Sequence, residues 1–214
     1  MIKILLVLVV LHVPAFSQQS KLSKAVNYLS EFIASDYYKQ LEKTNSSLSL
    51  VDTIYLRAVR YKNYDYSEAL LALTFATIPY NVVPIRLLPF VNITIDYPII
   101  TDSESIFLAK NRNLPSRLYY DTPTNDFGDR DKLAHLFGAA FISYTSYLFD
   151  FTNLIGYFVE VFEQTFEVQN SVDRRDLDTD KLGDLFGKVL RNSKKVLPSD
   201  IFLTYSLFNI RYTP

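Results

Sequence analysis

Apolar residues recur at helical spacing along most of this chain, and a proline-rich stretch interrupts the pattern. Spacings of three and four residues between apolar side chains are typical of amphipathic helices. The predicted helices cover residues 20–43, 50–59, 103–111, about 130–149, about 153–168 and about 178–193. We therefore expect a mainly α-helical fold with a C-terminal helical core at residues 130–193.

The interruption falls between Pro79 and Pro98, with two further prolines inside it. Proline at this frequency excludes both a long helix and a central strand. Val, Ile and Thr are frequent here, and residues 92–97 alternate like an edge strand or one arm of a hairpin. We predict a small extended or β element near residues 80–100. The last apolar stretch, residues 201–210, fits either a helix or a strand.

The N-terminus has the composition of a secretory signal peptide. Lys3 precedes an apolar run of about ten residues, and Ala15 and Ser17 provide small side chains at a cleavage site. A membrane span needs roughly 20 apolar residues, so a retained anchor is the weaker interpretation. We expect residues 1–17 to be a signal peptide and residues 18–214 to form a single domain. The expected location is the periplasm or the outer cell envelope.

Composition narrows the function classes. The chain has no cysteine, which excludes disulfides and a lipid-modified cysteine. Its formal net charge is −1, so no electrostatic argument supports nucleic-acid binding. Tyrosine and phenylalanine are abundant, with 16 of each. Tyrosine-rich surfaces suit protein interfaces and membrane boundaries, but a core rich in aromatic residues is the preferred interpretation.

Polar residues share faces on the C-terminal helices. His135, the one histidine after residue 17, follows Asp131 by four residues, so both lie on one face with Gly138 and Ala139. Two further faces carry carboxylates. They contain Glu160, Glu163, Gln164 and Glu167 on one helix, and Asp180, Gly183, Asp184 and Gly187 on the next.

If these faces meet, one imidazole and several carboxylates converge. A carboxylate could orient the imidazole as a general base, or the group could bind a divalent metal. The candidate catalytic residues are His135, Glu160 and Asp180. The candidate metal ligands are His135, Glu160, Glu163, Asp180 and Asp184. The sequence does not identify the cofactor.

Each feature also has a structural interpretation. The glutamates would form a solvated stripe, and Asp176, Asp178 and Asp180 would complement the positive end of the last helix. Gly183 and Gly187 would serve close helix packing alone.

Three spaced motifs suggest a family. Asp131-Lys132-x-x-His135, Glu160-x-x-Glu163 and Asp180-x-x-x-Asp184-x-x-Gly187 resemble the VanZ-like family and related predicted periplasmic lipoproteins of unknown function. The resemblance covers residues 131–190 and implies a shared site rather than a named reaction. VanZ-like proteins are membrane-embedded, whereas no apolar span of about 20 residues follows residue 17 here. Glu163 and Asp184 replace Gln and Asn of the family pattern, which adds negative charge.

Two functions from different classes follow for an exported envelope protein. In the first, the polar interhelical site binds a metal or performs hydrolytic or transfer chemistry on an envelope lipid or glycan. In the second, the protein is a non-catalytic scaffold or binding module, and the polar residues form a structural network. The tyrosine-rich loops at residues 61–66 and 118–121 would then contact a partner or a membrane surface.

Overall fold

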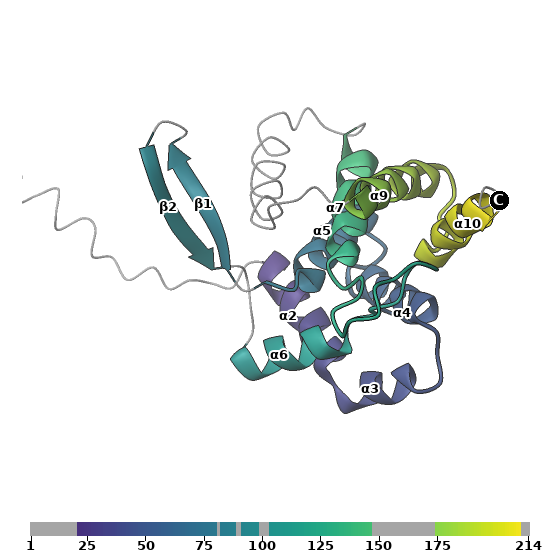
Figure 1. The fold of residues 1–214 in the computed structure, drawn as a ribbon, viewed down its shortest axis with the longest axis horizontal. Helices are drawn as coiled ribbons and strands as arrows, with labels where there is room; N and C mark the ends of the chain where they lie inside the picture. The colour runs from purple at the N-terminus through teal and green to yellow at the C-terminus, as the bar shows by residue number, and fades with distance from the viewer. Residues whose placement is uncertain (1–20, 81, 89–90, 99–102, 147–173, 211–214) are drawn as a thin grey trace, which may run out of the picture.

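The computed structural model describes residues 21–80, 82–88, 91–98, 103–146 and 174–210. Within these ranges the protein is mainly helical, which confirms the main part of the predicted fold class (Figure 1). The predicted signal peptide, the predicted helix at 153–168, Glu160 and Glu163 lie outside the described residues.

The N-terminal half contains α2 (Lys21–Ala34), α3 (Asp36–Glu42), α4 (Ser47–Tyr61) and α5 (Tyr66–Thr77). The prediction of one helix over residues 20–43 was wrong, because the chain breaks at Ser35. The Ser35 hydroxyl donates to the carbonyl of Phe32 at 2.6 Å and accepts from the N–H of Tyr38 at 3.2 Å. Ser35 thus ends α2 and caps α3 with one side chain.

Two strands follow. β1 (Val82–Leu88) and β2 (Val91–Pro98) pair antiparallel, with Val82 opposite Pro98 and an irregular register between Arg86 and Leu88. The pair forms the two-stranded hairpin drawn beside the helices in Figure 1.

The C-terminal half contains α6 (Glu104–Asn113), α7 (Lys132–Thr145), α9 (Arg174–Asn192) and α10 (Pro198–Ile210). Helix α9 begins four residues earlier than predicted. The stretch at 201–210, which fitted either a helix or a strand, is helical. Helix α10 closes back onto α4, where Asp52 accepts hydrogen bonds from the backbone N–H of Ser199 at 2.9 Å and from its hydroxyl at 2.6 Å.

Helix α7 is the centre of the packing. It is buried on nearly all sides and packs against α5 and α9. A helix that is apolar all round is expected to be internal. The largest wholly buried side chains of the core come from seven helices and the α6–α7 loop; they include Leu29, Ile54, Leu70, Leu114, Phe137, Phe186 and Phe202.

Glycines set the distance between α7 and α9. A Cβ atom on Gly183 would lie 2.4 Å from the carbonyl oxygen of Leu136 and 2.8 Å from the Cβ of Ala139. A Cβ on Gly187 would lie 2.5 Å from the carbonyl oxygen of Ala140. The interpretation in which both glycines serve close helix packing is therefore confirmed.

Among the described residues, no helix combines the length and the apolar character needed to span a bilayer.

We predict that Gly183→Ala destabilises the protein. In an unhindered helix this change would stabilise by about 1 kcal/mol. Here the methyl group would collide with the backbone of α7, and overpacking of this kind costs about 1–3 kcal/mol or more. Because the methyl group would meet backbone atoms that cannot move aside, we expect a cost near the upper end of this range and a net loss of about 2 kcal/mol in denaturant unfolding. Lys181→Ala, on the exposed side of the same helix, should stay within about 0.5 kcal/mol, and a stabilised Gly183→Ala protein would contradict the packing.

Candidate functional site

A cluster of ionisable side chains joins the first turns of α7 and α9. Asp131, Lys132 and His135 come from the start of α7, and Asp176 and Asp180 come from α9. We call these five residues the α7–α9 polar cluster. Four of the five are at least nine-tenths buried; Asp180 forms the outer edge.

Lys132 lies at the inner end of the cluster. Its ammonium donates to Asp131 Oδ2 at 2.8 Å and to Asp176 Oδ1 at 2.5 Å, and the residue is 3% exposed. Burial lowers the pKa of the ammonium group, but the hydrogen bonds and charges of the two carboxylates outweigh burial and raise the pKa above its usual 10.5. Lys132 is therefore charged at neutral pH.

His135 lies between Asp176 and Asp180 of α9. Its Nδ1 is 2.9 Å from Asp180 Oδ1, and its Nε2 is 3.6 Å from Asp176 Oδ1. The residue is 3% exposed, whereas the side chain of Asp180 is 42% exposed. A carboxylate at Nδ1 orients an imidazole ring and selects its tautomer. The reactive Nε2 edge faces the interior and Asp176.

The cluster has an excess of negative charge, because three carboxylates face one lysine. Such an excess favours a cation. Among the described residues, however, no group of three or more His, Asp or Glu side chains is arranged to hold a metal ion. Lys132 already occupies the place between Asp131 and Asp176 where a cation would sit.

Some of the predicted site residues meet in the structure, and others do not. His135 and Asp180 are brought together, as the shared faces suggested. Asp184 instead pairs with Lys188 at 2.6 Å on the surface, with its side chain 47% exposed. Its backbone carbonyl accepts from the Ser143 hydroxyl at 2.9 Å. Glu160 and Glu163 lie outside the described residues.

Sequence reasoning assigned Asp176 only a role at the end of a helix. The signal that would have identified it is its offset of four residues from Asp180, which places both on one face of α9. Asp176 then contacts both Lys132 and His135.

A second buried carboxylate was missed entirely. Asp129 is fully buried in the loop before α7, and its Oδ1 accepts from Arg175 at 2.8 Å. Its Oδ2 accepts from the N–H of Leu118 at 3.1 Å and from the Thr122 hydroxyl. Asp129 therefore ties the loop to the first turn of α9, beside the polar cluster. Nothing in the local sequence distinguishes it from the exposed Asp121 or Asp126.

The tyrosine-rich loops are only partly exposed. Tyr61, Tyr64 and Tyr120 are 39%, 64% and 61% exposed. Leu118 and Tyr119 are buried, so the prediction that all of residues 118–121 form a contact surface was wrong for these two. The Tyr119 hydroxyl lies 2.6 Å from that of Thr179 inside the protein.

Comparisons with models of known protein families, with curated proteins and with solved structures find no match for this chain. The VanZ-like resemblance over residues 131–190 therefore stays a prediction.

We predict that Lys132→Met is strongly destabilising. The change leaves Asp131 and Asp176 buried without their shared cation, and breaking a buried ion pair costs about 3–5 kcal/mol. Chemical denaturation should show this loss. Lys181→Met is the matched control, because Lys181 is 75% exposed and pairs with Asp178 only at the surface; it should cost less than about 1 kcal/mol.

The raised pKa of Lys132 predicts that its contribution to the free energy of unfolding depends on pH. Because the folded pKa of Lys132 lies above its ordinary value of 10.5, the stability that it contributes is complete below that pH. This contribution is lost as the pH rises through the folded pKa. The difference in unfolding free energy between the natural protein and Lys132→Met should therefore be constant near neutrality and shrink above about pH 10.5. A difference that grows with pH would contradict the arrangement.

Proposed function

We propose that this chain is an exported protein of the bacterial envelope that acts as a non-catalytic binding module or scaffold. The α7–α9 polar cluster is then a structural network that fixes α9 on α7. The observation that carries the proposal is the burial of both basic residues, because Lys132 and His135 are each 3% exposed.

Burial argues against direct chemistry at this cluster. A general base must come within hydrogen-bond reach of a substrate proton, directly or through one water. The Nε2 edge of His135 faces Asp176 from inside the protein, and Lys132 is held between two carboxylates. A buried network of this kind can specify one helix register, which is a role known for buried polar groups.

Export is supported by the pattern of residues 1–17, and the periplasm or outer envelope is the proposed location. The positions of Asp131, Lys132, His135 and Asp180 support a relation to the VanZ-like group. The proposed unit is a single mainly helical domain, residues 18–214, with a small extended element near residues 80–100.

The proposed partner is a membrane surface or an envelope lipid or glycan. Tyr61, Tyr64 and Tyr120 support this choice, because exposed tyrosines combine an apolar ring with a hydroxyl group. No nucleic-acid partner is proposed.

A second candidate is hydrolytic or transfer chemistry, with or without a divalent metal. It is favoured by the 2.9 Å contact between His135 Nδ1 and Asp180 Oδ1, which is the pairing that orients a catalytic imidazole. In this candidate His135 is the base or a metal ligand. Asp180 orients the ring or joins Glu160 and Glu163 as a ligand.

We predict that His135→Ala lowers the free energy of unfolding by roughly 2–4 kcal/mol, because it breaks a buried polar network. Asp184→Ala is the control on α9; it removes a surface ion pair and should cost less than about 1 kcal/mol. Denaturant titration of both variants measures the difference. A His135→Ala protein as stable as the natural one would favour the catalytic candidate, since active-site residues are often retained at the expense of stability.

Metal addition separates the candidates further. The melting temperature is measured in EDTA and then with Zn²⁺, Mn²⁺, Mg²⁺ or Ca²⁺. The structural proposal predicts no shift, because Lys132 already supplies the positive charge. A metal that binds the folded state must raise the melting temperature. A rise that disappears in His135→Ala would overturn the structural proposal and establish a metal site.

A further inference from the structure

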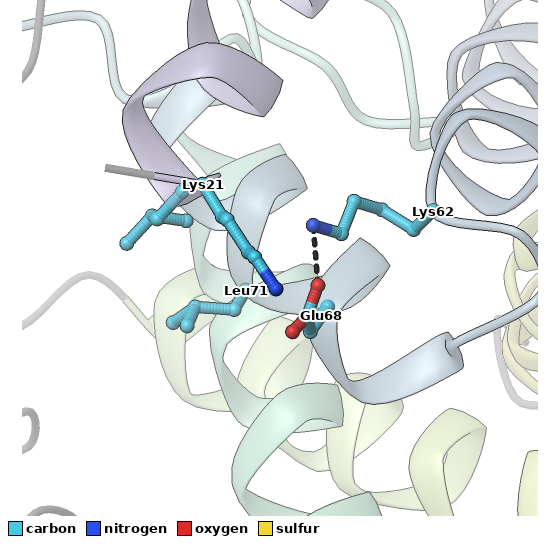
Figure 2. Close-up of a pocket in the computed structure, with 5 residues that line it drawn as sticks. Lys21, Lys62, Glu68 and Leu71 are labelled. Atoms are coloured by element: carbon cyan, nitrogen blue, oxygen red, sulfur yellow. Dashed lines mark ion pairs between the residues drawn. The ribbon is translucent and has the colours of Figure 1, made fainter. Parts of the chain in front are cut away.

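We propose that a small cavity at the start of α2 binds a carboxylate carried on a short apolar chain. The cavity has a volume of about 230 Å³ and lies between the start of α2 and the corner where α4 leads into α5 (Figure 2). It is lined by Lys21, Leu22, Lys62, Glu68 and Leu71.

The lining carries more positive than negative charge. Lys62 forms an ion pair with Glu68, and Figure 2 shows the Lys21 ammonium directed toward the same carboxylate from the other side. Two ammonium groups thus face one carboxylate. The side chain of Lys62 is only 11% exposed, whereas that of Glu68 is 51% exposed. The cation is therefore fixed in the wall, and the anion can turn toward solvent.

The backbone conformation between α4 and α5 explains why the side chains of Lys62 and Glu68 meet. Lys62 follows α4, and Asn63 and Tyr64 then adopt positive φ angles of 50° and 65°. Asparagine tolerates this left-handed conformation, whereas it is unfavourable for tyrosine, and here it reverses the chain within a few residues. The N–H of Asp65 donates to the carbonyl of Lys62 at 3.0 Å, and its side chain caps α5 by accepting from the N–H of Glu68 at 3.0 Å. The tight corner brings Glu68 beside Lys62.

Glu68 does not make the backbone hydrogen bond that a glutamate at this helix position often makes. In a capping box, the glutamate at this position turns back to the N–H of the capping residue. That N–H is already bonded to Lys62, so the Glu68 carboxylate pairs with the ammonium instead. Glu68 thus holds the position that a ligand carboxylate would take at Lys62.

The remaining lining defines the rest of the ligand. Leu22 and Leu71 provide an apolar wall next to the charged groups. Sites for drug-sized ligands are usually about 300–1,000 Å³, so this smaller cavity suits a short chain rather than a full lipid or an oligosaccharide. Charge-assisted hydrogen bonds from ammonium groups are the usual means of fixing such a carboxylate.

This inference goes beyond the proposed function. The cavity shares no residue with the α7–α9 polar cluster, so either can fail without the other. Loss of stability in His135→Ala reports on the cluster, whereas ligand binding at Lys62 reports on the cavity.

The test titrates the full chain with hexanoate and follows backbone amide signals by NMR. We expect saturable shifts that centre on Leu22, Lys62 and Leu71. Lys62→Gln should weaken binding about tenfold, because one charge-assisted hydrogen bond is lost. Glu68→Gln should strengthen binding about threefold or more, since the competing carboxylate is gone while the side chain keeps its shape.

Controls separate this site from general attraction to a positive surface. Lys39→Gln removes an equal charge from an exposed position on α3 and should leave the affinity unchanged. Lys21→Gln, at an exposed position, should weaken binding about threefold and provides a variant that does not change the half-buried Lys62. Melting temperatures confirm that each variant is folded.

Three results would overturn the proposal. The first is the absence of saturable shifts at the cavity. The second is equal affinity for hexanol, which would make the carboxylate irrelevant, or for inorganic phosphate, which would make the apolar chain irrelevant. The third is weaker binding in Glu68→Gln, which would show that Glu68 does not compete with the ligand.

Discussion

A side chain at Gly183 or Gly187 would place its Cβ atom about 2.5 Å from a carbonyl oxygen of α7, closer than a Cβ atom and a carbonyl oxygen can approach. Helix α9 therefore approaches α7 closely at the two positions that have no side chain, Gly183 and Gly187, and this close approach decides which other residues can meet. Asp180 precedes Gly183 by one turn, and Asp176 precedes Gly183 by two, so the same face carries both carboxylates over Lys132 and His135. The polar contacts follow from the backbone contact.

The close contact between α7 and α9 buries the charge of Lys132, and a buried charge needs opposite charges nearby. A lysine that is 3% exposed loses most of its hydration, and only nearby carboxylates compensate for the loss. Asp131 and Asp176 provide this compensation through ion pairs with the ammonium at 2.8 Å and 2.5 Å. Arg175, the neighbour of Asp176, forms a further ion pair with the buried Asp129. Two ion pairs from adjacent residues therefore hold the first turn of α9. One joins it to α7, and the other joins it to the loop that precedes α7.

Sequence patterns predicted the features that depend on neighbours along the chain. Helical spacing identified α4, α6, α7 and α9, and an offset of four residues placed Asp131 and His135 together. Features that depend on distant partners were not predictable. The buried charge of Asp129 is paired with Arg175, which is 46 residues away. Asp184 shares a helix with Asp180, but its position relative to α7 turns it toward Lys188 instead.

Local breaks were also hard to foresee. Apolar spacing continues through Ser35, so one helix was predicted where there are two. The break depends on one hydroxyl group that satisfies backbone groups on both sides, and serine occurs in helices often enough to hide it.

Asp52 and Ser199 connect α4 to α10 across 147 positions of the chain. During synthesis, α4 leaves the ribosome long before the helix that covers it, so this part of the core cannot close on the growing chain. Contacts between distant segments also delay folding, because the intervening chain must first be ordered. This part of the core can therefore form only after α10 has been synthesised. A polypeptide that completes its core only after α10 has been synthesised stays incompletely folded for most of its synthesis.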